Sequence, residues 1–225
     1  MLPLNDPEPN RYSGFPIMTL TLILVNILVL AGQLILEPLL PARLYYLLGS
    51  VPLLVMGQEG GGALASLTSM FMHGGIFHLL GNMFFLWVFG RRVEDACGSW
   101  RFLFFYLICG FMGDLLSTLA RHRSPVPSIG ASGAIAGLLG AYLILYPGGR
   151  IRTLIFVWWI PVLPKIQVFW FTLYFFFIQQ IIPVILGARD GVNYWAHIGG
   201  FVACIFIIFF MRPEAFARYL SNEPV

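Results

Sequence analysis

Six apolar stretches, each about long enough to cross a lipid bilayer as a helix, constrain the fold of this chain more than any other feature. A bilayer core of about 30 Å requires roughly 20 apolar residues in helical form. Irregular backbone cannot face lipid, because its polar groups would lack partners. We therefore predict an all-α polytopic membrane protein. Its six transmembrane helices are expected at residues 17–36, 75–94, 101–120, 131–147, 166–187 and 193–211.

The composition supports a membrane protein and excludes other classes. Hydrophobic residues make up 59% of the 225 residues and charged residues only 10%, which is unusual for a soluble domain. The net charge of +3, without a run of Lys or Arg, argues against a nucleic-acid partner. The three cysteines have no regular spacing, so we expect neither a disulfide framework nor a metal site.

Two tails and a long first connection surround the predicted helices. Residues 1–16 are polar and proline-rich, without the basic start of a secretory signal, so we expect a short cytoplasmic tail there. Residues 17–211 form the predicted six-helix membrane domain, and residues 212–225 a second cytoplasmic tail. The first connection, residues 37–74, contains moderately apolar pieces such as PARLYYLLGS, which suit helices lying at the membrane interface.

The distribution of Lys and Arg predicts the orientation, because cytoplasmic loops carry an excess of these residues. With the N-terminus inside, nine basic residues lie inside and four outside. The inner nine are Arg11, Arg91, Arg92, Arg101, Arg150, Arg152, Lys165, Arg212 and Arg218, and the outer four are Arg43, Arg121, Arg123 and Arg189. Both termini are therefore expected in the cytoplasm, and the second, fourth and sixth helices begin near the outer face.

Four polar residues converge at that outer layer. His78, Asn82, Ser132 and His197 lie within about two turns of the N-terminal ends of these three helices. Taken singly, each has a structural explanation: Ser132 can serve helix packing, Asn82 can join helices, and His197 can be a core histidine bound to a carbonyl. Polar residues inside a membrane are costly, and their convergence favours a functional site.

Ser132 and His197 have the chemistry of a nucleophile and its base. A serine hydroxyl is a weak nucleophile until a neutral imidazole removes its proton. Attack on an amide creates an oxyanion that needs preorganised donors. Asn82 and the backbone N–H groups that open the fourth helix can supply them. His78 lies four residues before Asn82, on the same helix face.

Small residues around the two reactive side chains allow close helix approach. Gly133 and Gly137 form a GxxxG step directly after the serine, and Gly199 and Gly200 follow the histidine. GxxxG is common in membrane helices, so the motif supports a functional site only because Ser132 lies beside it. The soluble nucleophile elbow G-x-S-x-G is excluded, because its fifth position is Ala134 and the surroundings are transmembrane.

The segments SMFMHGGIFHLLGNMFFLWVFGRRVEDACG, GASGAIAG and AHIGG closely resemble, in order and spacing, the rhomboid family of intramembrane serine proteases. The resemblance covers roughly residues 64–205. It implies a six-helix core with a long first loop, cleavage of single-span membrane proteins near the membrane surface, and no metal or organic cofactor. It also implies Ser132 as nucleophile and His197 as base in a dyad, with His78 and Asn82 stabilising the oxyanion. The fifth helix and the loop before the sixth are implied to act as a movable gate.

Two places depart from the pattern of many relatives. Leu64 and Ala65 stand where a Trp-Arg pair is common, and Ala136 stands where an aromatic residue often packs against the catalytic histidine. Neither change removes a reacting group. The first loop and the imidazole must therefore be held by other contacts. Tyr194, Trp195 or another nearby aromatic side chain can pack against the imidazole.

Other polar residues receive structural interpretations. We expect His73 to order the loop before the second helix, or the cavity mouth, by hydrogen bonding, and direct catalytic contact is the alternative. Asp114, inside the third apolar segment, is a structural polar contact, a water-facing residue or a third member that orients His197. Glu94 and Asp95, beside two arginines, are expected to organise the short inner turn.

Together these features predict a serine endopeptidase that cleaves membrane-anchored proteins near the outer face of the lipid bilayer. The alternative is an inactive relative that binds membrane proteins, although such branches typically lack the serine or the histidine. A small transporter would need an inverted repeat or a broken midplane helix, and neither is evident. The compact core suggests a prokaryotic plasma membrane, and an organelle protein with a trimmed presequence stays open.

Overall fold

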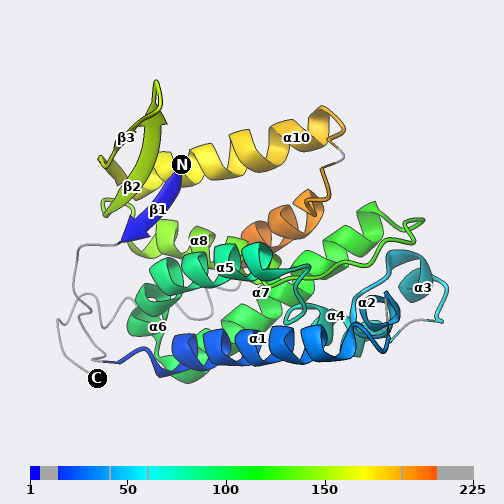
Figure 1. Cartoon of the computed structure of the whole chain (residues 1–225). Helices are drawn as coiled ribbons and strands as arrows, with labels where there is room; N and C mark the ends of the chain where they lie inside the picture. Colours follow the sequence, from blue (N-terminus) through cyan, green and yellow to red (C-terminus); the bar gives the residue numbers. More distant parts are fainter. Residues whose placement is uncertain (6–14, 41, 60, 189, 207–225) are drawn as a thin grey trace.

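The computed structural model describes residues 1–5, 15–40, 42–59, 61–188 and 190–206, and these residues are mostly helical (Figure 1). The predicted tail at 212–225 and the basic residues Arg11, Arg189, Arg212 and Arg218 lie outside them. The helices are α1 Ile17–Leu36, α2 Arg43–Leu48, α3 Pro52–Met56, α4 Gly62–Ser69, α5 Ile76–Phe85, η1 Leu86–Gly90, α6 Arg91–Cys97, α7 Ser99–Ala120, α8 Ser132–Leu145, α9 Val168–Leu173, η2 Tyr174–Ile181, α10 Ile182–Ile185 and a last helix, Tyr194–Phe206.

Within the described residues, three helices are long and apolar enough to cross a membrane: α1, α7 and the continuous helix Val168–Ile185, which comprises α9, η2 and α10. The helix α8 and the last helix are apolar but shorter. The elements α5, η1 and α6 follow one another without a break from Ile76 to Cys97. Apart from the end predicted at residue 211, which lies outside the described residues, the helix ends differ from the predicted ones by no more than three residues, and α1 coincides with its prediction.

A small sheet corrects the all-α prediction. Strand β2 (Arg150–Val157) pairs antiparallel with β1 (Leu2–Asn5), β3 (Ile160–Val162) and β4 (Lys165–Gln167). The segment from β2 to β4 was predicted as an inner loop, yet its Ile, Thr, Val and aromatic residues favour strands. The strand β1 lies in the predicted N-terminal tail. The sheet lies at one end of the bundle, and α2, α3 and α4 lie at the other (Figure 1).

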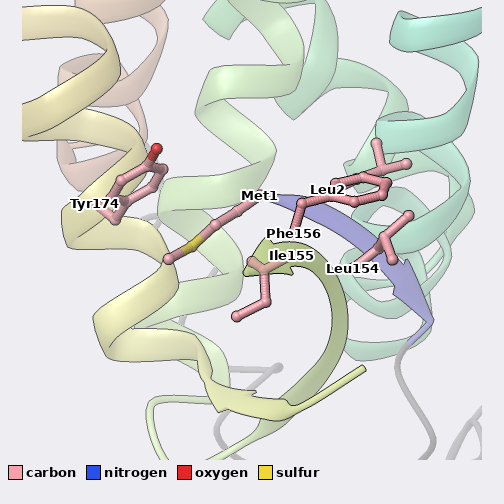
Figure 2. A pocket seen from close by; sticks show the side chains of 6 residues that line it. All are labelled: Met1, Leu2, Leu154, Ile155, Phe156 and Tyr174. Carbon is pink, nitrogen blue, oxygen red and sulfur yellow. The ribbon is translucent and has the colours of Figure 1, made fainter. Parts of the chain in front are cut away.

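A cavity of about 480 Å³ opens beside this sheet (Figure 2). The residues that line it come from β1, β2 and η2: Met1, Leu2, Leu154, Ile155, Phe156 and Tyr174. None of the predicted site residues lines it. The cavity is therefore separate from the candidate site. The candidate site is positioned by helix packing.

Small residues let α7, α8 and the last helix pack closely. A Cβ atom added at Gly137 would lie 2.6 Å from the Cys109 Sγ, and one added at Gly200 would overlap the carbonyl oxygen of Gly133. Such contact leaves no room for a side chain between the backbones. The close approach brings the start of α8 within hydrogen-bond reach of the last helix.

A charged cluster at the far end of the Ile76–Cys97 helix ties several elements together. The buried Glu94 carboxylate accepts hydrogen bonds from the backbone N–H groups of Met18 and Thr19, both at 2.8 Å. The hydroxyls of Thr19 and Ser99 also donate to it, at 2.7 and 2.6 Å. Glu94 therefore caps the N-terminus of α1 from a different helix, where the helix dipole favours a negative charge.

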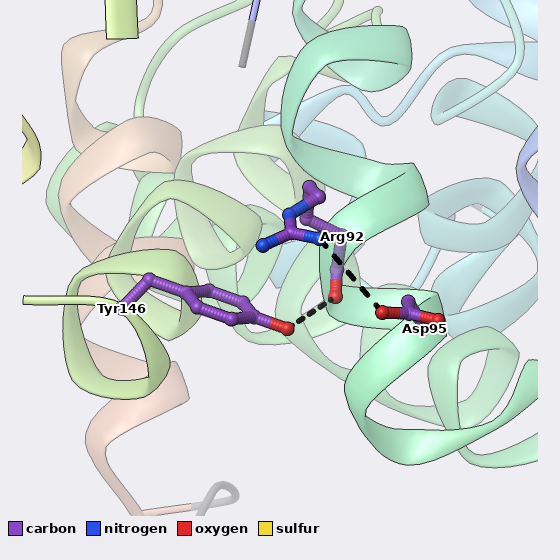
Figure 3. Close-up of polar contacts among 3 residues, drawn as sticks. All are labelled: Arg92, Asp95 and Tyr146. Carbon is purple, nitrogen blue, oxygen red and sulfur yellow. Dashed lines mark hydrogen bonds and ion pairs between the residues drawn. The ribbon is translucent and has the colours of Figure 1, made fainter. Parts of the chain in front are cut away.

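Arg92 completes this charged cluster (Figure 3). Its guanidinium lies 3.9 Å from the Asp95 carboxylate and 4.6 Å above the Tyr146 ring, and both charged side chains are fully buried. The Tyr146 hydroxyl donates to the Arg92 carbonyl oxygen at 3.2 Å. The cluster joins α6 to the end of α8, in addition to the predicted ordering of the turn after α6.

Candidate active site

Ser132 and His197, 65 residues apart in the sequence, meet in the fold. Ser132 is the first residue of α8, and His197 lies in the first turns of the last helix. The Ser132 Oγ and His197 Nε2 are 2.7 Å apart, which is a hydrogen bond. Both residues are half-buried, so a substrate or water can reach the pair. This geometry fits a hydroxyl nucleophile next to a base.

The two predicted oxyanion residues lie on α5, beside the chain that leads into Ser132. A Cβ atom added at Gly130 would lie 2.8 Å from His78 Nε2 and 3.5 Å from Asn82 Nδ2. Gly130 also has a φ of +114°, which favours glycine. His78 is exposed, whereas Asn82 is buried. Among the described residues, no hydrogen bond joins either side chain directly to Ser132 or His197.

His73 holds the Asn82 amide in one orientation. Its ring accepts a hydrogen bond from Asn82 Nδ2 through Nε2 at 2.9 Å, and its Nδ1–H donates to the Phe71 carbonyl at 3.2 Å. Burial, and to a smaller extent the nearby His78, lower the pKa of His73 to about 4, although the hydrogen bond to the Phe71 carbonyl opposes this shift. The ring is thus neutral at neutral pH, and Nε2 is free to accept.

Gln33 and Asn193 fix the surroundings of the pair. The Gln33 amide exchanges two hydrogen bonds of 3.0 Å with the backbone of His73, linking α1 to the loop before α5. Asn193 Oδ1 accepts from the Ala196 N–H at 3.3 Å and so caps the helix that carries His197. Its Nδ2 donates to Ser128 Oγ at 2.6 Å, four residues before Ser132. The backbone around both reactive residues is therefore held by side chains.

Of the three alternatives predicted for Asp114, the structure supports the structural polar contact. Its Oδ2 accepts hydrogen bonds from Ser50 at 2.7 Å and Ser66 at 2.6 Å, and the side chain is buried. These serines belong to the connection between α1 and α5, so Asp114 attaches that connection to α7. It does not orient His197, whose second ring nitrogen contacts another residue.

That residue is Gln180, which the sequence analysis missed. Its Oε1 lies 2.7 Å from His197 Nδ1, and its side chain is buried. The available signal was a glutamine pair in the apolar run FFFIQQIIP, because a polar residue inside a membrane span is a functional candidate. Tyr194 also lies near the imidazole, with ring centroids 6.5 Å apart in an edge-to-face arrangement.

Comparison with known proteins identifies the family. The model of the Rhomboid domain matches residues 61–214. RHOMBOID-like protein 6, mitochondrial, of Arabidopsis thaliana is 36% identical over 151 residues, which are 66% of this chain and 44% of the relative. Rhomboid protease GluP of Bacillus subtilis is 49% identical over 84 residues, which are 37% of this chain and 16% of that protein.

A yeast relative, Rhomboid protein 1, mitochondrial, of Saccharomyces cerevisiae, is 38% identical over 97 residues, covering 41% of this chain and 28% of the relative. The chain spans less than half the length of each of these relatives. The family match nevertheless covers more than half of the chain, and it confirms the resemblance that the motifs suggested. The protein is therefore a multi-pass membrane protein that belongs to the rhomboid family.

Proposed function

We propose that this protein is an intramembrane serine endopeptidase, in which Ser132 attacks the substrate and His197 acts as general base and acid. The 2.7 Å hydrogen bond between Ser132 Oγ and His197 Nε2 carries the proposal. Membership of a family that includes a named protease, GluP, adds support. The substrates are membrane-anchored proteins with a single span, cleaved near the outer membrane face, and no cofactor takes part.

The proposed reaction proceeds in two stages. In the first, His197 Nε2 takes the proton of Ser132 Oγ while Oγ bonds to the scissile carbonyl carbon. The imidazolium then gives this proton to the amine nitrogen as the C–N bond breaks, which leaves an ester on Ser132. In the second stage, Nε2 takes a proton from water as the water oxygen attacks the ester, and the proton returns to Ser132 Oγ.

Donors near Gly130 are proposed to stabilise the oxyanion of each tetrahedral intermediate. An amide nitrogen has two hydrogens; Asn82 directs one to His73 Nε2, which leaves the other for the oxyanion. The first backbone N–H groups of α8 have no partner within the helix and carry its positive dipole end. His78 lies beside the same glycine. Removing one such donor typically costs about 2.7–4 kcal/mol of transition-state stabilisation.

The proposed placement in the bilayer has six spans within residues 17–211, formed by α1, the Ile76–Cys97 helix, α7, α8, the Val168–Ile185 helix and the last helix. The tails at 1–16 and 212–225 then face the cytoplasm, and Ser132 faces the outer side. We propose a prokaryotic plasma membrane, while the names of the Arabidopsis and yeast relatives keep a mitochondrial location as the alternative.

The test uses purified protein in detergent. A fluorophosphonate probe should label the wild type, and Ser132→Ala or His197→Ala should abolish labelling. Both variants should also lower cleavage of a single-span substrate by about 10³-fold or more, because nucleophile and base act as one unit. Matched controls are Ser124→Ala and His122→Ala, which lie in the loop between α7 and α8.

Each outcome has a definite meaning. Cleavage that persists in purified Ser132→Ala, or labelling at another serine, would refute the assignment of the nucleophile. A folded wild type that neither labels nor cleaves, under conditions where an active relative does both, would favour the inactive binding protein instead. Loss of activity in the two control variants would show that the assay reports folding rather than chemistry.

A further inference from the structure

The side-chain carbonyl of Gln180 contacts the ring nitrogen of His197 that does not face Ser132. Its Oε1 lies 2.7 Å from His197 Nδ1, while His197 Nε2 lies 2.7 Å from Ser132 Oγ. The three side chains come from three different helices: η2, the last helix and α8. They form a continuous chain of two hydrogen bonds that ends at the hydroxyl.

The chemistry of this contact selects one form of the imidazole. A neutral imidazole has one N–H donor and one acceptor nitrogen, and a neighbouring acceptor determines which nitrogen carries the proton. An amide oxygen can only accept, so it holds the proton on His197 Nδ1. The lone pair is then on Nε2, which faces Ser132 Oγ and can receive its proton. The opposite tautomer would turn an N–H toward the serine and could not act as base.

Two contacts hold the ring of His197 in place. Ala136, one turn after Ser132, has only a methyl group and offers no ring for the imidazole to pack against. The imidazole is held from the neighbouring helix by the Gln180 carbonyl, and from its own helix by the edge-to-face contact with Tyr194. A buried amide in an apolar helix is costly unless it is hydrogen-bonded. The Gln180 oxygen accepts its hydrogen bond from His197.

Gln179 provides an internal comparison. It is adjacent in sequence and identical in chemistry, but it is only half-buried and points elsewhere on the helix. Gln180, in contrast, has 4% of its surface exposed. Of the two glutamines, the buried one is the one placed against the imidazole.

We propose that Gln180 is a positioning residue that holds the tautomer and ring orientation of His197 required for catalysis. This proposal rests on the function proposed above, because it assumes that His197 is the base. It makes the serine–histidine pair dependent on the Val168–Ile185 helix, which supplies no reacting atom. Gln180 then acts through His197 and does not touch the substrate.

The test compares Gln180→Met, which removes the acceptor at similar size, with Gln180→Glu, which keeps an oxygen acceptor, and with the control Gln179→Met. Gln180→Met should lower kcat by about 10- to 100-fold with little change in KM, by analogy with the loss of groups that orient metal-bound histidines. The rate at which a fluorophosphonate labels Ser132 should fall in parallel. Gln179→Met should match the wild type.

Two further readouts separate positioning from folding. Gln180→Glu should recover most of kcat, with the acid limb of its pH profile moved to higher pH, because a carboxylate stabilises the imidazolium. In the wild type, ¹⁵N spectra of labelled histidine should show the ring proton of His197 on Nδ1, and the chain has only four histidines to assign. This measurement requires no variant to fold.

The outcomes distinguish the two proposals. If the wild type cleaves and Ser132→Ala does not, but Gln180→Met equals Gln179→Met, then the positioning role is wrong and the proposed function stands. A wild-type His197 protonated on Nε2 would overturn the positioning role equally. If the wild type shows no activity that depends on Ser132, the proposed function itself has failed.

Discussion

Two buried polar clusters lie at opposite ends of the Ile76–Cys97 helix and differ in kind. The charged cluster of Arg92, Glu94 and Asp95 is closed, and each of these side chains has at most 1% of its surface exposed. The candidate site has neutral groups, and its central residues, Ser132 and His197, are half-buried. Buried charge has to be fully compensated, which suits it to joining helices. Neutral groups do not need full compensation, so the Ser132 hydroxyl can stay accessible to a substrate.

The largest expected effect is on stability, at the charged cluster. In Glu94→Gln an NH₂ group replaces one of the two carboxylate oxygens, so it faces either the two Thr19 donors or the donors of Met18 and Ser99. Hydrogen bonds to a charged group are worth about 1.5–3 kcal/mol each, so we expect a loss of roughly 3–5 kcal/mol in the free energy of unfolding. Thermal unfolding in detergent measures this, with the exposed Glu59→Gln as control. A variant as stable as the wild type would contradict the capping role.

The next effect concerns the site and depends on pH. The pKa of His73 is lowered to about 4, mainly by burial, against a value near 6.5 in the unfolded chain. The unfolded state therefore binds the proton first, so His73 destabilises the fold progressively as pH falls from 6.5 to about 4, and the effect is constant below that. The difference corresponds to at most about 3 kcal/mol.

His73→Gln should remove this part of the pH dependence. A glutamine oxygen can still accept from Asn82 but does not titrate in this range. Melting temperatures of wild type and variant are compared from pH 7.5 to 4, so that the other histidines, which both proteins retain, cancel. If the two curves of melting temperature against pH were parallel, protonation of His73 would not be what destabilises the fold at acid pH.

A smaller effect is expected where the two reactive helices touch. In Gly200→Ala the new Cβ would overlap the carbonyl oxygen of Gly133, so the last helix has to move away from α8. Overpacking of this kind typically costs about 1–3 kcal/mol. The shift also lengthens the distance between Ser132 and His197. The rate of cleavage should therefore fall by more than the loss of folded protein alone would cause. The control is Gly32→Ala in α1, where a Cβ meets open space. Equal activity in both variants would contradict the close approach.

The same two clusters show how far the sequence predicts this molecule. The apolar segments and the motifs around Ser132 and His197 are local signals, because helical spans and their ends depend on neighbouring residues. Partners across helices are not local. Glu94 was expected in a turn, yet it caps α1 some 75 residues away, and Gln180 carries no motif that would point to His197.

The sheet was missed for a related reason. The pairing of β1 with β2 joins residues 2–5 to the segment after α8, and this pairing depends on the whole chain rather than on either segment. The segment from Arg150 to Val157 lies between two apolar helices, where its hydrophobic residues resemble those of a loop at a membrane. Its β-branched and aromatic composition was the available signal.

The smallest expected effect tests whether the negative charge of Asp114 matters. Asp114 accepts two serine hydroxyls through one oxygen, and in Asp114→Asn the amide oxygen can accept the same two hydrogen bonds. We expect a change below about 1 kcal/mol in the free energy of unfolding, within the range of a net neutral hydrogen bond. Cleavage should stay close to the wild-type level, because Asp114 does not contact His197.

Asp114→Leu removes the acceptor and leaves the hydroxyls of Ser50 and Ser66 without it. This variant should lower the free energy of unfolding more than Asp114→Asn does. If Asp114→Asn were as damaging as Glu94→Gln, the negative charge itself would be required beside the site, and the contrast between a charged structural cluster and a neutral reactive one would be wrong.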